Sequence, residues 1–330
     1  MARINGVIMT IKVGLFGTNG HQIQYAIESY ENLDLVAVAG IQAEHVPEFY
    51  RESVQYYDTF DALLEDSSID LVSLCSPYRS EQANHAIKAL KAGKHVYAEK
   101  PCALNETDLD AIIDTARSTG KIFHEMAGTT FVQPYKKMKE IVGSGILGDI
   151  VQVYAQKSYP LLENRPQDEA IDGGLIMQNG VHATRFVEQI SGQRIQDITA
   201  IETNFTNPGE GDLQIAATMM MRLGNGGIAT IIANYLNPPN FGTWGNEHVR
   251  IFGTTGLLES TDGGTRTRLI THEKDFGEID CSGESDDFFQ FFLDEILLDD
   301  TFPISLEDEL HPTRMVIQAK QKSTVSPSSQ

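Results

Sequence analysis

IKVGLFGTNGH, residues 11–21, is the stretch that decides the fold of the first half of the chain. Its first six residues are mostly apolar and predict a buried strand, and the glycines after it predict a tight turn. Gly14 lies in this strand, and Gly17, Thr18, Asn19 and Gly20 lie in the turn. A glycine turn between a strand and a helix lets backbone N–H groups approach a phosphate, so these five residues are candidates for a dinucleotide site.

The glycine pattern departs from the usual G-x-G-x-x-G, because Asn19 and Gln22 stand at the second and third glycine positions. Taken alone, a purely structural turn explains such a pattern equally well. The next strand, residues 35–39, runs into Gly40. No carboxylate at this point repels a 2′-phosphate and no arginine attracts one, so Gly40 is a candidate contact that leaves NAD and NADP both open.

Short apolar runs alternate with amphipathic segments up to residue 126, which predicts a doubly wound parallel sheet of the Rossmann type. The expected strands are residues 11–16, 35–39, 69–75, 95–98 and 121–126. The expected helices are residues 22–30, 80–92 and 106–118, the last with Asn105 as an available cap.

Beyond residue 126 the pattern changes to longer strands with short turns, which predicts a large, mostly antiparallel open sheet in an α/β domain. The expected strands are residues 150–157, 200–205, 213–222, 227–235, 248–252 and 267–271, with helices over 134–144 and up to about 190. We therefore expect a nucleotide-binding domain over 1–126 and a second domain over 127–330.

Composition excludes several classes of function. The 330 residues carry 25 Lys+Arg against 46 Asp+Glu, a formal charge of −21. Such a surface repels nucleic acid and anionic membranes, and no apolar run is long enough to span a bilayer. The three cysteines are widely spaced and the histidines form no metal motif, so we expect a cytoplasmic protein without a metal. Either Met1 or Met9 is a candidate start.

Residues 273–310 hold 14 acidic residues and one lysine. A steering surface for a cationic partner is one interpretation. The pattern favours a solvated helix face, because phenylalanines over 288–292 provide an apolar side to bury.

GKHVYAEKP, residues 93–101, resembles the G-K-H-V-x-x-E-K-P signature of the glucose–fructose oxidoreductase/inositol dehydrogenase (Gfo/Idh/MocA) family. Further segments resemble that family in order. They are Ser76-Pro77 at a strand end, GGL at 173–175 followed by GVH at 180–182, and RIFGTTG at 250–256. The resemblance covers residues 10–320 and implies NAD(P)-dependent oxidation of a hydroxyl on a sugar, cyclitol or related polyol. It also implies a homodimer or homotetramer that forms through the C-terminal sheet.

The resemblance assigns roles to individual residues. Lys100 matches the family lysine beside the nicotinamide and would hydrogen-bond the reacting oxygen, while Glu99 and Pro101 would shape the ring pocket. His182 matches the catalytic histidine, since a neutral imidazole is a suitable base near neutral pH. Ser76 and Pro77 would contact the cofactor.

The chain departs from the family beside His182. Gln178 stands four residues earlier, where the family carries Asp, and Arg185 stands where an acid is frequent. An amide cannot stabilise an imidazolium as a carboxylate does, so Gln178 predicts a weaker base. Asp172 could substitute, although a plain helix cap explains it better.

Trp244 lies in a glycine-rich loop and, with Tyr159, is a candidate for stacking on a sugar ring; an oligomer contact is an equal alternative. Two other functions stay open. One is an NAD-dependent glycosidase that uses transient oxidation, and the other is a nucleotide-binding sensor or regulator with weak catalysis.

Overall fold

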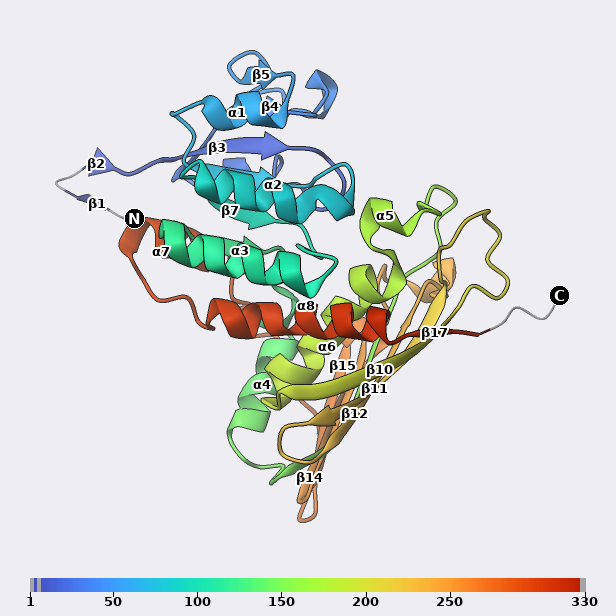
Figure 1. The fold of residues 1–330 in the computed structure, drawn as a ribbon. Coiled ribbons are helices and arrows are strands. Elements are labelled where there is room, and N and C mark those ends of the chain that lie inside the picture. The colour runs from blue at the N-terminus through green and yellow to red at the C-terminus, as the bar shows by residue number, and fades with distance from the viewer. Residues whose placement is uncertain (1–2, 5–6, 327–330) are drawn as a thin grey trace. The chain divides into compact units, whose positions relative to one another are not determined.

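The computed structural model describes residues 3–4 and 7–326, so Met1 lies outside the described residues. The chain forms two compact units (Figure 1). The first runs up to Ala127 and also takes up residues 170–172 and 289–310. The second consists of residues 128–169 and 173–288 and of the chain from His311 onward.

The first unit contains a six-stranded sheet in which every neighbouring pair is parallel, in the order β5-β4-β3-β6-β7-β8. The strands are β3 (Ile11–Phe16), β4 (Leu33–Ala39), β5 (Gln55–Tyr57), β6 (Leu71–Leu74), β7 (His95–Ala98) and β8 (Phe123–Glu125). The predicted doubly wound sheet is confirmed. A separate antiparallel pair, β1 (Arg3–Ile4) and β2 (Val7–Ile8), precedes it.

Helices α1 (Phe60–Glu65), α2 (Arg79–Lys91) and α3 (Glu106–Thr119) connect these strands (Figure 1). Asn105 caps α3 as expected, because its side chain accepts the Asp108 N–H at 2.9 Å. Later in the chain, α7 (Phe288–Leu298) brings two aromatic rings to the sheet. The rings of Phe289 and Phe292 lie 4.8 and 5.5 Å from that of Tyr97 on β7.

The predicted helix over residues 22–30 is wrong. The segment forms turns and a single 3-10 turn at Ile27–Ser29. The side chain of Gln22 supplies a reason: its amide donates to the Gly17 carbonyl at 3.0 Å, and its oxygen accepts the Ile23 N–H at 3.0 Å. A side chain that satisfies local backbone groups competes with the helix. No regular α-helix therefore begins at the glycine turn.

The second unit is built on a nine-stranded sheet in the order β16-β15-β14-β13-β9-β12-β11-β10-β17. The strands are β9 (Ile150–Ser158), β10 (Ile195–Thr203), β11 (Ala216–Leu223), β12 (Ile228–Asn234), β13 (His248–Gly253), β14 (Gly256–Thr261), β15 (Arg266–Thr271), β16 (Asp275–Glu278) and β17 (Thr324–Val325). Only β9–β12 and β10–β17 pair in parallel. The mostly antiparallel second sheet is therefore confirmed.

One face of this sheet carries the buried core and the opposite face carries exposed apolar side chains. The helical elements of the second unit are α4 (Tyr135–Gly143), α6 (Val181–Arg185) and the part of α8 (Leu306–Gln321) from His311 onward, with π-helical turns at Ile176–Gly180 and Phe186–Ile190. The short helix α5 (Glu169–Asp172) lies mostly in the first unit. Met219, Ile231 and Ile251 are buried, whereas Ile201, Met220 and Ile228 are at least half exposed. Within the described ranges, no helix has the length and apolarity to cross a bilayer.

Candidate functional site

The turn after β3 can be built only with glycine at two positions. Gly17 has φ +70°, and a Cβ there would lie 2.1 Å from the Cys75 carbonyl oxygen. Gly20 has φ +130°, and a Cβ there would lie 2.5 Å from Glu99 Cγ. Both conformations are strained for other residues, so the main chain of the turn stays free of side-chain bulk. A turn of this kind fits the diphosphate of a dinucleotide.

Hydrogen bonds tie this turn to the ends of the neighbouring strands. The Gly17 N–H donates to the Ala39 carbonyl at 3.0 Å, beside Gly40, whose φ is +64°. The Asn19 side-chain amide donates to the Pro77 carbonyl at 3.1 Å and to the Ile171 carbonyl at 2.6 Å. Asn19, at a usual glycine position, thus serves as a tether within the first unit.

Ser76 and Pro77 connect β6 to α2. Ser76 is fully buried; its N–H donates to Gln82 Oε1 at 2.9 Å, and its hydroxyl lies 2.9 Å from His85 Nδ1. These bonds fix the strand end against α2, and the hydrogen bond from Asn19 to the Pro77 carbonyl ties it to the glycine turn. The structure thereby brings together the candidate cofactor residues of β3 and β6.

Glu99 and Lys100 follow β7 and are both buried, with exposed fractions of 0% and 1%. The His21 N–H donates to Glu99 Oε2 at 3.0 Å, and His21 Nδ1 lies 3.1 Å from Glu99 Oε1. Lys100 Nζ lies 3.8 Å from the same Oε1 atom. The residue after Lys100, Pro101, closes a cis peptide bond.

The charge of Glu99 is stabilised despite its burial. Burial alone would raise its pKa, but the hydrogen bond from His21 and the positive charges of Lys100 and Arg79 hold the pKa below its ordinary value. Arg79 is itself 1% exposed, and its Nη2 donates to the Asn19 carbonyl at 2.7 Å. Sequence reasoning missed His21 and Arg79, because both lie between motif positions.

In the second unit, His182 lies on α6 and is 7% exposed. Its Nδ1 lies 3.2 Å from the hydroxyl of Thr129, a partner that the sequence did not indicate. Gln178 belongs to the π-helical turn before α6, so Gln178 and His182 are not separated by one turn of regular α-helix. Arg185, at the end of α6, is fully buried.

The two aromatic candidates of the second unit lie together. The rings of Tyr159 and Trp244 are 5.8 Å apart, and Trp244 is 54% exposed. Lys157 Nζ lies 5.1 Å from the Tyr159 ring and forms an ion pair with Glu247. Burial lowers the pKa of Lys157, although the Glu247 carboxylate opposes that shift. Lys157 and Glu247 are polar residues beside the two aromatic rings, and sequence reasoning missed both.

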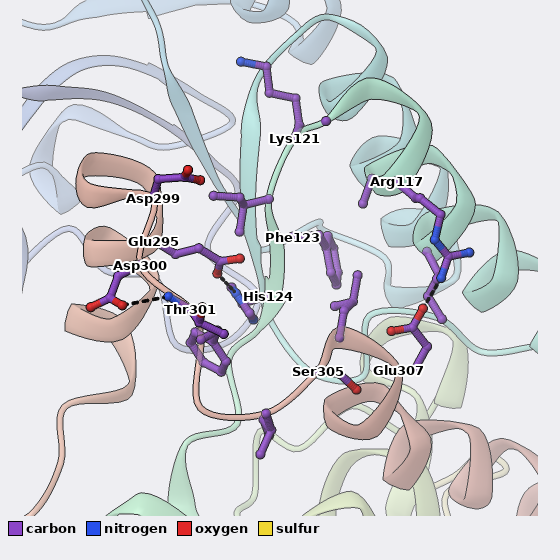
Figure 2. Close-up of a pocket in the computed structure, with 17 residues that line it drawn as sticks. Arg117, Lys121, Phe123, His124, Glu295, Asp299, Asp300, Thr301, Ser305 and Glu307 are labelled. Carbon is purple, nitrogen blue, oxygen red and sulfur yellow. Dashed lines mark hydrogen bonds and ion pairs between the residues drawn. The ribbon is translucent and has the colours of Figure 1, made fainter.

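A separate cavity of about 620 Å³ lies in the first unit beside β8, and none of the predicted site residues lines it. Figure 2 shows Glu295 of α7 reaching His124 on the wall of this cavity, where Nε2 lies 2.8 Å from Glu295 Oε2. The Nδ1 atom pairs with Glu309, which also accepts the Glu125 N–H at 2.9 Å. Two acidic residues of the 273–310 segment, Glu295 and Glu309, therefore pair with His124 and do not simply face solvent.

Burial opposes the protonation of His124, but Glu309 and Glu295 together raise its pKa to about 9. The cluster is thus an ion triad at neutral pH, with His124 and Glu309 both nearly inaccessible to water. Over the described ranges, no group of three His, Cys, Asp or Glu residues is arranged to hold a metal ion.

Comparison with known proteins agrees with this arrangement. Residues 11–126 match the model described as an oxidoreductase family with an NAD-binding Rossmann fold, and residues 135–259 match the GFO/IDH/MocA C-terminal domain. The first unit is therefore an NAD(P)-binding Rossmann domain.

Among curated relatives, myo-inositol 2-dehydrogenase of Thermotoga maritima is 24% identical over 64% of this chain and 62% of its own. Trans-1,2-dihydrobenzene-1,2-diol dehydrogenase of Bos taurus is 26% identical over 51% of each chain. The matches thus span about half to three fifths of these relatives.

Among solved structures, the aldose-aldose oxidoreductase of Caulobacter crescentus superposes with a TM-score of 0.78, at 18% identity, over 95% of this chain and 97% of the other. At this identity the likeness shows the fold alone. The two family models together cover most of the chain and match both of its domains in order. The chain belongs to the Gfo/Idh/MocA oxidoreductase family.

Proposed function

We propose that the protein is an NAD(P)-dependent oxidoreductase that transfers a hydride between the nicotinamide and a hydroxyl or ketone carbon of a sugar, cyclitol or related polyol. The observation that carries the proposal is Lys100, a buried lysine at the C-terminal end of β7. Its neighbour Glu99 contacts the turn that follows β3. In a parallel sheet these strand ends share one edge, where such folds bind dinucleotides.

The chemistry requires a cation near the reacting oxygen and a group that takes the hydroxyl proton. Bound NAD(P) supplies the hydride acceptor. Lys100 and His182 are the residues that the family resemblance assigns to the cation and the proton acceptor. Thr129 orients the His182 ring, and Gln178 binds a substrate hydroxyl.

Gly17, Thr18, Asn19, Gly20, Gly40, Ser76, Pro77, Glu99 and Pro101 would hold the dinucleotide. The turn after β4 offers Gly40 and neither an acid nor an arginine at the ribose position, so it favours neither NAD nor NADP.

The substrate class follows from the second domain. Trp244 and Tyr159 form a half-exposed aromatic surface, which suits the apolar CH face of a sugar or cyclitol ring. Arg185 would support the substrate pocket from α6. The names of the two curated relatives, which act on a cyclitol and on a cyclic diol, support a ring-shaped polyol.

A panel of polyols and sugars, followed by nicotinamide absorbance with NAD and with NADP, tests the proposal. We expect net formation of reduced nicotinamide with at least one ring polyol. Sugar release without net reduction would instead identify the glycosidase chemistry, and nucleotide binding without either activity would identify a sensor.

The open face of the second sheet supports a homodimer or homotetramer. Ile201, Met220, Ile228 and Phe252 are exposed there, and their strand partners place them on one face. An apolar patch on a sheet of this size is typical of a surface that binds another copy of the chain.

Met220→Asp places a charge in this patch and should convert the assembly to monomers. Light scattering coupled to size-exclusion chromatography measures the mass. Phe49→Asp, at an exposed apolar residue of the first unit, is the control and should leave the mass unchanged. A wild-type protein that is already monomeric at working concentration would contradict the proposed assembly.

A cytoplasmic location fits this activity. Cys75, Cys102 and Cys281 are all free thiols in the structure. Free thiols and a nicotinamide cofactor are both typical of a reducing compartment.

A further inference from the structure

Oxidation of a hydroxyl releases one proton, and that proton must reach water in every turnover. Lys100 is 1% exposed, so its ammonium group cannot exchange freely with bulk solvent. His182 is 7% exposed. Burial strengthens the interaction of these groups with the charge that develops in the reaction. It also separates them from the water that must receive the proton.

Lys100, Glu99 and His21 are three titratable groups in succession, and the last of them, His21, is exposed to solvent. Lys100 Nζ lies 3.8 Å from Glu99 Oε1, and the same oxygen lies 3.1 Å from His21 Nδ1. The side chain of Glu99 is fully buried, whereas that of His21 is 74% exposed. His21 Nδ1 also lies 3.2 Å from Glu99 Oε2, so the Glu99 carboxylate stands between a buried lysine and an imidazole in solvent.

The geometry of Glu99 is fixed for this position. The His21 N–H donates to Oε2 at 3.0 Å, which orients Oε1 toward the lysine and the imidazole. The groups that act on the charge of Glu99 are His21, Lys100 and Arg79. A guanidinium group does not give up its proton in a protein, so His21 and Lys100 are the partners that can exchange one.

We propose that Lys100, Glu99 and His21 form a proton relay that connects the reacting oxygen to solvent. Lys100 is the group that exchanges the proton. This inference rests on the proposed function and adds two residues to it, Glu99 as the buried carrier and His21 as the exit.

In the oxidation direction, the hydride leaves the carbinol carbon for the oxidised nicotinamide, and the C–O bond becomes C=O as the O–H bond breaks. The hydroxyl proton forms a bond to Nζ of Lys100, which has become neutral by first passing one of its ammonium protons to Glu99 Oε1. That first proton moves on to Nδ1 of a His21 ring that carries hydrogen on Nε2. The Nε2–H bond breaks and the proton enters water. Reduction runs the same steps in reverse.

The contact between Nζ and Oε1 is about 1 Å longer than a hydrogen bond, so the lysine must turn toward Glu99 for the first transfer. A lysine side chain has four rotatable carbon bonds and can make this change. His21 returns to its starting tautomer by exchange with water, because its ring is exposed.

The test is His21→Ala, measured as kcat in dilute, non-imidazole buffer. Loss of the exit should lower kcat by about tenfold with little change in KM, since general acid–base steps are worth at least this much. Added imidazole should restore kcat with saturation, which a merely structural role of His21 would not produce. His45→Ala, at another exposed histidine of the first unit, is the control and should behave as wild type.

A second readout needs neither cofactor nor substrate. ¹⁵N chemical shifts of the nucleotide-free protein show which ring nitrogen of His21 carries hydrogen. Contact with the Glu99 carboxylate predicts hydrogen on Nδ1 at rest. The relay also requires that exchange with water populates the Nε2–H form, which accepts the proton from Glu99, and the His45 ring is the internal reference.

A His21→Ala enzyme with wild-type kcat at every buffer concentration, or with a loss that imidazole cannot restore, would overturn the relay. So would a His21 ring held in a single tautomer, because transfer through the ring needs both. If the wild-type protein oxidises no polyol, the proposed function fails, and the ¹⁵N measurement then decides the Glu99–His21 contact separately.

Discussion

Lys100→Ala should lower kcat by about 10²-fold to 10⁴-fold and leave the affinity for NAD(P) within a few-fold of wild type. The lysine acts on charge that develops only as the reaction proceeds, so its loss affects the transition state more than the bound ground state. The measurement is kcat on the best substrate, together with the cofactor dissociation constant by calorimetric titration.

Lys100→Met keeps the apolar stem of this buried side chain and should lose activity equally, which separates loss of the ammonium from loss of packing. Lys91→Ala, at an exposed lysine near the end of α2, is the matched control. Wild-type kcat in either Lys100 variant would remove the lysine from the mechanism.

Glu309→Gln should lower the free energy of unfolding by about 3 kcal/mol, because removing one member of a buried ion pair leaves the other charge poorly compensated. His124 and the Glu125 N–H both depend on the Glu309 carboxylate. Urea titration followed by circular dichroism measures the change.

The control lies two residues earlier on α8. Glu307 pairs with Arg117 at the surface, and exposed pairs of this kind contribute less than about 1 kcal/mol. Glu307→Gln should therefore be close to wild type. Equal losses in the two variants would show that the buried triad has no special role in stability.

The pH dependence provides an independent check on His124. Its pKa is raised from 6.5 to about 9 in the folded protein. A raised pKa means that the folded state binds the proton more tightly, so the stabilisation is fully present below pH 6.5 and is lost as pH rises through 9. Between these values, wild-type stability should fall by at most about 1.4 kcal/mol per pH unit, and Glu309→Gln should reduce this slope.

Much of the first domain could be predicted from its sequence. The ranges predicted for β3 and β7 agree with the structure residue for residue. The range predicted for α2 is shifted by one residue, and that for α3 ends one residue early. The reason is that a buried parallel strand needs a continuous apolar run, and that pattern is visible locally. The short edge strand β5 was missed because Gln55 and Tyr56 are exposed and carry no such signal.

Features that depend on tertiary contacts had no local signal. The segment after Gly20 has an amphipathic pattern, yet the Gln22 side chain satisfies the backbone groups that a helix would use. The His124–Glu309 pair joins residues 185 positions apart. The acidic composition of residues 273–310 indicated a solvated surface and gave no sign that Glu309 is buried.

In the candidate site, too, some residues could be predicted from the sequence and others depend on tertiary contacts. Motifs identified Lys100, Glu99 and the glycine turn, because these residues have a fixed order along the chain. Partners that those residues acquire by folding, such as His21 for Glu99 and Thr129 for His182, could not be found without coordinates. The π-helical turn containing Gln178 was hidden for the same reason, since sequence spacing assumes a regular α-helix.

The most direct measurement of the proposed chemistry is transfer of deuterium from the reacting carbon. The best polyol of the panel is labelled at its carbinol carbon and incubated with the enzyme and the oxidised nicotinamide cofactor, and the reduced cofactor is analysed by mass spectrometry. Hydride transfer predicts one deuterium on the nicotinamide ring for each ketone formed. Ketone formation with the deuterium released to water, or left on the organic product, would contradict it.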